Sequence, residues 1–236
     1  MKKYLLLLLV LALSFTTAFA ADESTIIIKT SKPVGTTVSL DAYTASKDEA
    51  FTVDWGDGEE KIYNVDPNGW GYSRCIKTEI KGGTITIKGK LVNFDLTEAG
   101  ITSVDLHGQT ALKVINLKKN EIATFKQDGM PALTELNLRD NKLTTFSGTG
   151  MTSLKTLNLQ GNQLDSHEFD ITDASATLTE LTVSDNGDKF ITLNLVAFTA
   201  LEYFYCDDNP EFTTAVFADN NANINKISMN LSLIHI

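Results

Sequence analysis

Apolar and polar residues follow one recurring pattern through the middle of the chain, L-x-x-L-x-L-x-x-N-x-L. Five copies lie between residues 112 and 209, and their asparagines are separated by 21, 21, 24 and 23 residues. The copies comprise Leu112, Ile115, Leu117, Asn120 and Ile122; Leu133, Leu136, Leu138, Asn141 and Leu143; Leu154, Leu157, Leu159, Asn162 and Leu164; Leu178, Leu181, Val183 and Asn186; and Leu201, Phe204, Cys206 and Asn209. An earlier partial match predicts an incomplete unit that leads into the first full copy; it consists of Ile101, Val104, Leu106 and Gln109. Repetition at a nearly fixed period indicates a solenoid.

The L-x-L part of each copy predicts a short strand, because residues two apart in a strand point to the same side. Neighbouring copies are expected to pair in parallel, about 4.8 Å apart. The asparagine then turns the chain, and its amide can bond to backbone groups, so stacked asparagines predict a ladder. One repeat cannot bury its apolar edge, and the core therefore forms only when repeats stack.

The opposite side of the solenoid is expected to be convex and short of helix, because copies of 21 residues leave little room for one. Residues 144–146 and 192–195 predict short extended pieces there. Residues 165–177 lengthen the fourth copy, so we expect a local irregularity on the convex side that leaves the core unchanged.

The segment before the repeats has a different pattern. Runs at residues 25–29, 35–40, 51–55 and 84–88 predict strands. The Asp-Trp-Gly-Asp-Gly sequence at 54–58 contains an Asp-Gly step, which supplies the positive φ of a tight hairpin. The predicted fold is mainly β: a small β-sandwich-like cap domain over residues 21–90, followed by a solenoid over residues 91–230 with a parallel sheet on its concave face.

Both ends of the chain predict segments outside this fold. Residues 1–20 have the layout of a signal peptide, with Lys2 and Lys3, an apolar run, and small residues at Ala18 and Ala20. The apolar run is too short for a membrane anchor, so we expect export to the medium or cell surface and no membrane span in the mature chain. Residues 231–236, Leu-Ser-Leu-Ile-His-Ile, resemble a translated sequencing adapter; the alternative is a natural strand. On the adapter interpretation the natural protein is longer.

Composition limits the class of binding partner more than it limits the fold. The 236 residues are 42% hydrophobic and 21% charged, which is ample for a core. The formal charge is −10, and it becomes −12 without residues 1–20, which hold two lysines and no acidic residue. A surface this acidic repels phosphates, so no nucleic-acid partner is expected. We expect a monomer.

Catalytic chemistry has little support in the sequence. His107, His167 and His235 belong to no recognisable triad or metal motif, so we predict no enzyme, no metal and no cofactor. Asp54, Asp57, Glu59 and Glu60 raise the question of calcium, but their spacing fits no calcium loop and favours a charged hairpin. Two cysteines are too few for a disulfide framework; Cys206 is expected in the core and Cys75 in the cap, unpaired.

The better candidate is a surface, because residues flanking the inward leucines must point onto the concave face. Three columns are expected there: Asn116, Asn137, Asn158, Thr182 and Tyr205; Val114, Glu135, Thr156, Glu180 and Tyr203; and Lys118, Arg139, Gln160, Ser184 and Asp207. From these columns the predicted ligand-binding residues are Asn116, Lys118, Glu135, Asn137, Arg139, Asn158, Glu180, Thr182, Tyr203, Tyr205 and Asp207. A merely solvated sheet face is the alternative. Tyrosine combines apolar area with a polar tip, which is typical of binding surfaces.

The repeats resemble the leucine-rich repeat family. Their short form, with Thr-Ala-Leu or Thr-Ser-Leu before several copies, is similar to bacterial secreted and surface proteins such as the internalins. The Trp-Gly-Asp-Gly turn resembles that of PKD-type β-sandwich modules, although the later aromatic motif of those modules is missing. The resemblance implies adhesion, and a fold-level likeness is weak warrant for a function.

Two functional hypotheses follow. The first is a secreted or cell-surface, non-enzymatic binding module that recognises a protein or glycan at the cell exterior through the concave face. It predicts that changing Tyr203 and Tyr205 to Ala abolishes binding while the fold persists. The alternative is an accessory or spacer region of a longer exported protein, for example an enzyme, whose downstream domain is missing. The complete gene would distinguish the two.

Overall fold

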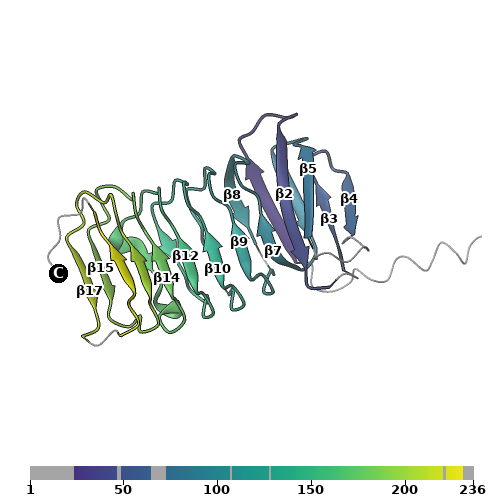
Figure 1. The fold of residues 1–236 in the computed structure, drawn as a ribbon. Helices are drawn as coiled ribbons and strands as arrows, with labels where there is room; N and C mark the ends of the chain where they lie inside the picture. The colour runs from purple at the N-terminus through teal and green to yellow at the C-terminus, as the bar shows by residue number, and fades with distance from the viewer. Residues whose placement is uncertain are drawn as a thin grey trace, which may run out of the picture.

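The structure is a computed structural model that describes residues 24–46, 49–64, 73–106, 108–127, 129–219 and 222–230. The expected signal peptide (1–20), the hexapeptide at 231–236, His107 and His235 lie outside the described residues. The molecule is elongated, with an N-terminal β-unit at one end and a stack of repeats leading to the other end (Figure 1). In the described part of the chain, no helix has the length and apolar character needed to cross a membrane.

The N-terminal unit, which we define as the described residues up to 90, contributes strands to two sheets. Strands β1 (Thr25–Thr30), β3 (Ala50–Asp54), β4 (Glu60–Asn64) and β6 (Thr84–Lys88) join β8 (Ile101–Asp105) in a sheet of order β4-β3-β6-β1-β8. Strands β2 (Thr37–Thr44) and β5 (Ser73–Glu79) belong to the second sheet. Alternation decides what is buried: Ile26 and Ile28 are fully buried, whereas Ile27 between them is 41% exposed. The four strands predicted in this segment are confirmed.

The hairpin between β3 and β4 forms as its sequence predicts. Gly58 has a φ of 81°, which residues with a side chain rarely adopt. Asp54 Oδ1 accepts hydrogen bonds from the backbone N–H groups of Gly56, at 2.8 Å, and Gly58, at 3.0 Å. Trp55 is buried, and its indole N–H donates to the hydroxyl of Tyr63 at 3.1 Å. The acidic turn is thus a capped hairpin in which Asp54 serves the backbone.

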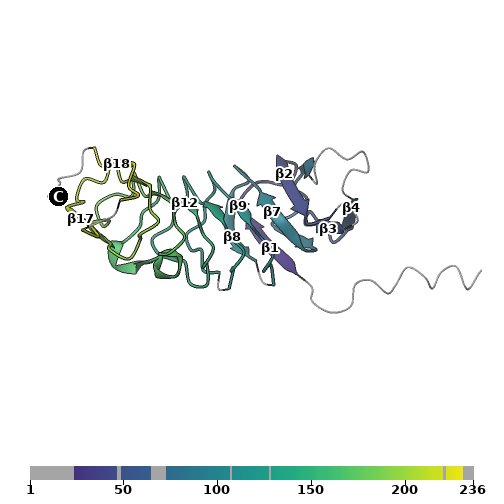
Figure 2. The same cartoon turned by 60° about the horizontal axis from the view of Figure 1, so that its bottom comes forward.

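The second sheet has nine strands and runs through both parts of the molecule, in the order β18-β16-β14-β12-β10-β9-β7-β2-β5. The repeat strands are β7 (Leu91–Asp95), β9 (Val114–Asn116), β10 (Glu135–Asn137), β12 (Thr156–Asn158), β14 (Glu180–Thr182), β16 (Tyr203–Tyr205) and β18 (Lys226–Ser228). These seven pair in parallel, and β2 pairs antiparallel with both β7 and β5. Figure 2 shows the repeats as successive coils along the molecule. The predicted parallel solenoid is confirmed.

The partial match at residues 101–109 does not form the incomplete unit predicted for it. Strand β7, and not the partial match at Ile101, Val104, Leu106 and Gln109, pairs in parallel with the first full copy. The residues that take the repeat positions, 21 residues before the first full copy, are Leu91, Phe94, Leu96, Ala99 and Ile101. The partial match instead contributes β8, which pairs antiparallel with β1 in the other sheet. This first unit does not match the full repeat motif, because Ala99 occupies the position at which later copies have asparagine.

The asparagines form the predicted ladder. Asn141 is 7% exposed, and its Oδ1 accepts from the N–H of Ile122 in the preceding repeat at 3.0 Å. Its Nδ2 donates to the carbonyls of Leu117 and Leu138, both at 2.9 Å. The same bonding joins Asn120, Asn162, Asn186 and Asn209 to their neighbours. The side chains thus satisfy backbone groups where each strand ends.

The convex side carries a stack of phenylalanines that the repeat pattern does not predict. Ring centroids lie 5.7 to 6.4 Å apart along Phe125, Phe146, Phe169, Phe190 and Phe212. Short extended pieces accompany the stack: β11 (Phe146–Ser147), β13 (Phe169–Asp170), β15 (Thr192–Leu195) and β17 (Thr214–Phe217). The lengthened fourth copy forms the 3-10 turns η1 (Ser166–Glu168) and η2 (Thr172–Ala174), while β12 and β14 keep their pairing. The extended piece predicted at 192–195 and the local irregularity are confirmed, whereas the piece predicted at 144–146 is shorter and ends one residue later, as β11.

Candidate functional site

The concave face displays the predicted columns in register. Cα pairing aligns Val114, Glu135, Thr156, Glu180, Tyr203 and Lys226 in one column, and Asn116, Asn137, Asn158, Thr182, Tyr205 and Ser228 in the next. All of these side chains are half-buried or exposed. The third column, from Lys118 to Asp207, is also accessible except for Ser184, which is 5% exposed. Ser184 Oγ accepts from the N–H of Asp207 at 3.0 Å, so it serves the turn.

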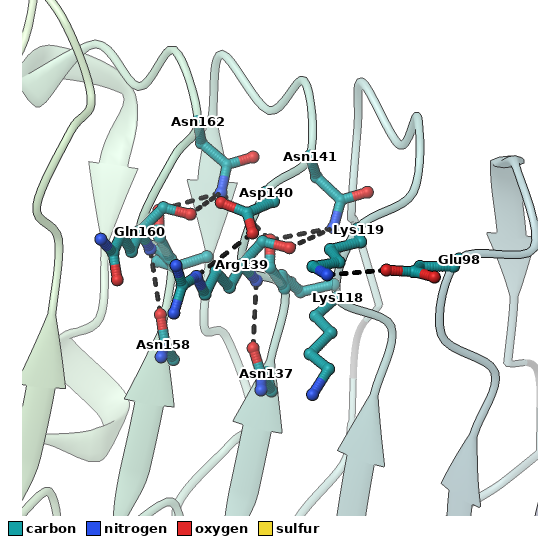
Figure 3. A network of polar contacts seen from close by, with 12 residues as sticks. Glu98, Lys118, Lys119, Asn137, Arg139, Asp140, Asn141, Asn158, Gln160 and Asn162 are labelled. Atoms are coloured by element: carbon teal, nitrogen blue, oxygen red, sulfur yellow. Dashed lines mark hydrogen bonds and ion pairs between the residues drawn. The ribbon is translucent and has the colours of Figure 1, made fainter.

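Three asparagines of the face accept a hydrogen bond from the turn that follows their strand, and two of them keep their amino groups available. Asn137 Oδ1 accepts from the N–H of Arg139, and Asn158 Oδ1 from that of Gln160, both at 3.1 Å (Figure 3). Asn116 makes the same bond to the N–H of Lys118 at 3.4 Å. The amino groups of Asn137 and Asn158 donate to no other described residue. These two side chains therefore hold the strand end with one atom and offer donors on the concave face with the other.

The face continues onto the N-terminal unit, which the repeat pattern does not predict. Asp41 and Tyr43 of β2 lie opposite Asp95 and Asn93 of β7. Asp95 is occupied, because Asn116 Nδ2 donates to it at 2.7 Å and the Thr97 hydroxyl at 2.8 Å. The Asp41 carboxylate makes no hydrogen bond or ion pair to any other described residue. Only the antiparallel pairing of β2 with β7 places these residues beside the repeats, and no motif marks them.

An open groove of about 360 Å³ lies over this junction. Strands β2, β7, β9, β10 and β12 form it, and its lining consists of Asp41, Tyr43, Asn93, Phe94, Asp95, Val114, Ile115, Asn116, Glu135, Leu136, Asn137, Thr156 and Asn158. Four predicted residues, Asn116, Glu135, Asn137 and Asn158, are brought together here. Tyr43 and Glu135 project with no side-chain partner among the described residues. The groove thus combines carboxylates, amides and two aromatic residues, of which Phe94 is buried beneath the surface and Tyr43 is accessible.

Cations lie beside the groove rather than in it. Arg139 Nε is 3.2 Å from Asp140 Oδ2, and the neighbouring Lys119 donates to Glu98 at 2.7 Å (Figure 3). The hydrogen bond from Lys119 lowers the pKa of Glu98 below its ordinary value, and the same bond raises the pKa of Lys119. Lys118 Nζ forms no ion pair within the described residues. Of the two basic residues in the predicted binding surface, Lys118 is therefore available to a ligand and Arg139 is already paired.

The aromatic end of the face lies beyond the groove, on β16. Tyr203 is 36% exposed, and Lys226 Nζ stands 5.0 Å from the centroid of the Tyr205 ring. Asp207 Oδ1 accepts from the Ser228 hydroxyl at 2.9 Å and from the N–H of Asn230 at 2.6 Å. Asp207 is thus held within the last turn, and Tyr203 is the freest of the three predicted residues at this end.

The remaining candidates for chemistry are placed as ordinary structural residues. In the described ranges, no three His, Cys, Asp or Glu side chains converge on a metal-sized site. The ring of His167 is exposed and contacts Asp165 at 3.0 Å. The two cysteines do not form a disulfide with each other; Cys206 is buried and Cys75 is exposed, near Ser39 Oγ at 3.3 Å. Burial raises the pKa of the Cys206 thiol to about 12, which makes it a poor nucleophile.

The comparisons with known proteins agree with the architecture. The family model described as leucine rich repeat matches residues 127–164. No curated protein and no solved structure matches the chain. Together with the stacked parallel strands, the match defines a leucine-rich repeat solenoid. Solenoids of this class present extended curved surfaces and typically act as binding scaffolds.

Proposed function

We propose that the chain is an exported, non-enzymatic module that binds a partner protein on its concave face, centred on the groove at the junction of β2, β7, β9, β10 and β12. One observation carries the proposal: three polar side chains that line a concave hollow, Asp41, Tyr43 and Glu135, leave their bonding capacity unused within the described part of the protein. Among the described residues, the side chains of Asp41, Tyr43 and Glu135 have no partner. Such convergence is the usual property of a binding site.

The lining suits an extended polypeptide. Asp41 and Glu135 can accept from backbone N–H groups or basic side chains, and the amides of Asn137 and Asn158 can donate to carbonyls. Val114 and the ring of Tyr43 add apolar area, which a peptide side chain can cover. Tyr203 lies two strands beyond β12, so a longer partner can reach the aromatic end as well.

A displayed-peptide selection tests whether the groove binds a polypeptide. Random dodecapeptides are selected on the purified protein, and enriched peptides are measured by fluorescence anisotropy. Changing Tyr43 and Glu135 to Ala should weaken binding about 10-fold or more, as loss of interface anchors does. A matched double change on the convex side, Thr192 and Asn194 to Ala, should leave affinity within about twofold, because surface residues outside the interface contribute little.

The predicted aromatic end is measured in the same assay. Changing Tyr203 and Tyr205 to Ala reports how far the partner extends along the face, with far-UV circular dichroism as the check on folding. Enriched peptides that ignore both the groove change and the tyrosine change would contradict a concave site. A glycan array in parallel provides the other outcome: glycan binding lost on the groove change, with no peptide enriched, would replace the protein partner by a carbohydrate.

Export has its own test. The basic start, apolar run and small residues before position 21 support cleavage after Ala20. Expressed from its own start in a secreting host, the protein should reach the medium with Ala21 as its first residue, as read by N-terminal sequencing. Retention of an uncleaved chain inside the cell would contradict this part of the proposal.

A further inference from the structure

The groove on the concave face has an acidic lining. It contains the three carboxylates of Asp41, Asp95 and Glu135 and no lysine, arginine or histidine. Lys77 lies on β5, beside β2, and Lys118 follows β9; neither lysine forms an ion pair with another described residue. In the described part of the chain, none of the three carboxylates is paired with a basic side chain. The charge of the groove is therefore complementary to a cationic partner.

Two of these carboxylates face each other across neighbouring strands. Asp41 of β2 is the Cα partner of Asp95 of β7 in the antiparallel pair. Side chains paired in this way have Cβ atoms about 5 Å apart, and like charges placed directly opposite each other destabilise a sheet. Asp95 accepts hydrogen bonds from Asn116 Nδ2 at 2.7 Å and from the Thr97 hydroxyl at 2.8 Å, whereas Asp41 accepts none from the other described residues. A cation bound between the two aspartates removes a repulsion that the free protein bears.

We propose that the partner protein inserts an arginine side chain between Asp41 and Asp95; this inference rests on the proposed function. A guanidinium is planar and has five N–H donors, so it can donate to two carboxylates at once. Each oxygen of Asp95 accepts one hydrogen bond in the structure and has a further lone pair for the guanidinium. An ammonium group has three donors and no planar fork, so arginine suits this pair of carboxylates better than lysine.

Glu135 sets the position of a second basic residue. It lies on β10, three strands from β2 in the sheet order, which corresponds to about 14 Å along the solenoid at the usual strand spacing. An extended polypeptide that crosses the strands advances about 3.3 Å per residue, so its side chains four residues apart share a side and lie about 13 Å apart. The partner segment therefore carries an arginine for Asp41 and Asp95 and a second basic residue, four positions away, for Glu135.

The dodecapeptides enriched in the displayed-peptide selection provide the test. They are resynthesised with citrulline, the uncharged isostere of arginine, at each arginine in turn. Loss of the inserted arginine should weaken binding about 10-fold, because hydrogen bonds between charged groups are lost. Asp41→Asn should weaken the parent peptide by a similar factor, yet should not weaken the citrulline peptide further, since both changes remove the same contact. Moving the second basic residue next to the arginine should also weaken binding.

A matched control separates a local contact from the overall charge of the protein. Asp188→Asn makes the same change in charge in the exposed loop between β14 and β15, outside the groove, so the affinity should stay within about twofold. Urea unfolding adds a readout without any peptide. Asp41→Asn should raise the midpoint, because it removes one of two like charges placed opposite each other. A lowered midpoint would assign Asp41 to the fold and overturn the proposal.

The binding results distinguish this inference from the proposed function. Peptides that depend on Tyr43 and Glu135 but contain no arginine overturn the inference and leave the proposed function standing. The same holds for arginine peptides that tolerate both citrulline and Asp41→Asn. Peptides that are indifferent to the Tyr43 and Glu135 change contradict the proposed function itself, and the inference with it.

Discussion

Replacing one ladder asparagine tests how the repeats are held together. In Asn141→Ala, the N–H of Ile122 loses its acceptor at 3.0 Å and is left buried without one. The carbonyls of Leu117 and Leu138 each keep another hydrogen-bond donor. Leu117 O still accepts from Asn120 Nδ2 at 2.9 Å, and Leu138 O still accepts from Asn162 Nδ2 at 3.1 Å. A third acceptor, Arg139 O, lies 3.3 Å from Asn141 Nδ2 and still receives the N–H of Lys119 at 2.8 Å. The variant thus orphans one donor and removes three further hydrogen bonds whose acceptors keep another donor.

The expected loss follows from these four groups. An orphaned buried donor costs about 2 kcal/mol, and each redundant hydrogen bond adds about 0.5 kcal/mol, so the free energy of unfolding should fall by about 3.5 kcal/mol. Asn137→Ala is the matched control, since it removes an amide of the concave face with one accessible turn bond at 3.1 Å. That control should lose less than about 1 kcal/mol.

Urea unfolding followed by far-UV circular dichroism and tryptophan fluorescence measures both variants; the two signals should coincide if unfolding is two-state. The double variant Asn141→Ala with Asn162→Ala sharpens the test, because it removes both side-chain donors from Leu138 O. We expect it to lose about 1 kcal/mol more than the sum of the single losses. Equal losses for Asn141→Ala and Asn137→Ala, or strict additivity in the cycle, would refute the reasoning.

A pH series on Asn141→Asp separates the acceptor from the donor. This substitution keeps an oxygen for the N–H of Ile122 but turns a carboxylate toward the carbonyls of Leu117 and Leu138. Burial and the two carbonyls should raise the pKa of the introduced carboxyl above its value in the unfolded chain. The penalty is then largest above the folded-state pKa and shrinks as the pH falls through it, so the variant should approach the parent protein toward about pH 4.

Further predictions concern the turn, the convex stack and the thiols. Gly161→Ala should cost about 1 kcal/mol in urea unfolding, because its φ is 69° and the new Cβ would lie 2.5 Å from Asp140 Oδ1; an unchanged midpoint would contradict this. Phe190→Ala should cost about 4 kcal/mol in the same assay, since the fully buried ring packs between two others; a loss below about 2 kcal/mol would mean that the stack relaxes. In the folded protein Ellman's reagent should label the exposed Cys75 and not the buried Cys206, with both labelled in guanidinium; fast labelling of two thiols without denaturant would be the contrary result.

The repeat positions could be predicted because they depend on spacing alone. Leucines two apart must share a face of a strand, so the pairing of Leu136 with Leu157 was predictable from the pattern. The ladder asparagines were predictable for the same reason, since the turn needs a side chain that both donates and accepts. The phenylalanine stack was less visible, although Phe125, Phe146, Phe169, Phe190 and Phe212 recur at intervals of 21 to 23 residues. This regular interval in the sequence would have predicted that the phenylalanines stack.

Half of the groove could not be predicted, because it depends on pairing between distant segments. Asp41 and Tyr43 belong to a strand 50 residues or more before their partners Asp95 and Asn93. No local pattern indicates that β2 continues the concave sheet. The strand of the first unit was not identified from the motif, because Ala99 takes the position of the asparagine.

The sequence by itself determined the solenoid, its concave columns and the side chains that hold its turns, since a repeating pattern allows only one way to bury every leucine. The tertiary structure decided where the hollow of the concave face lies. It did so because antiparallel pairing joined the N-terminal unit to β7, placing Asp41 and Tyr43 beside the repeat asparagines.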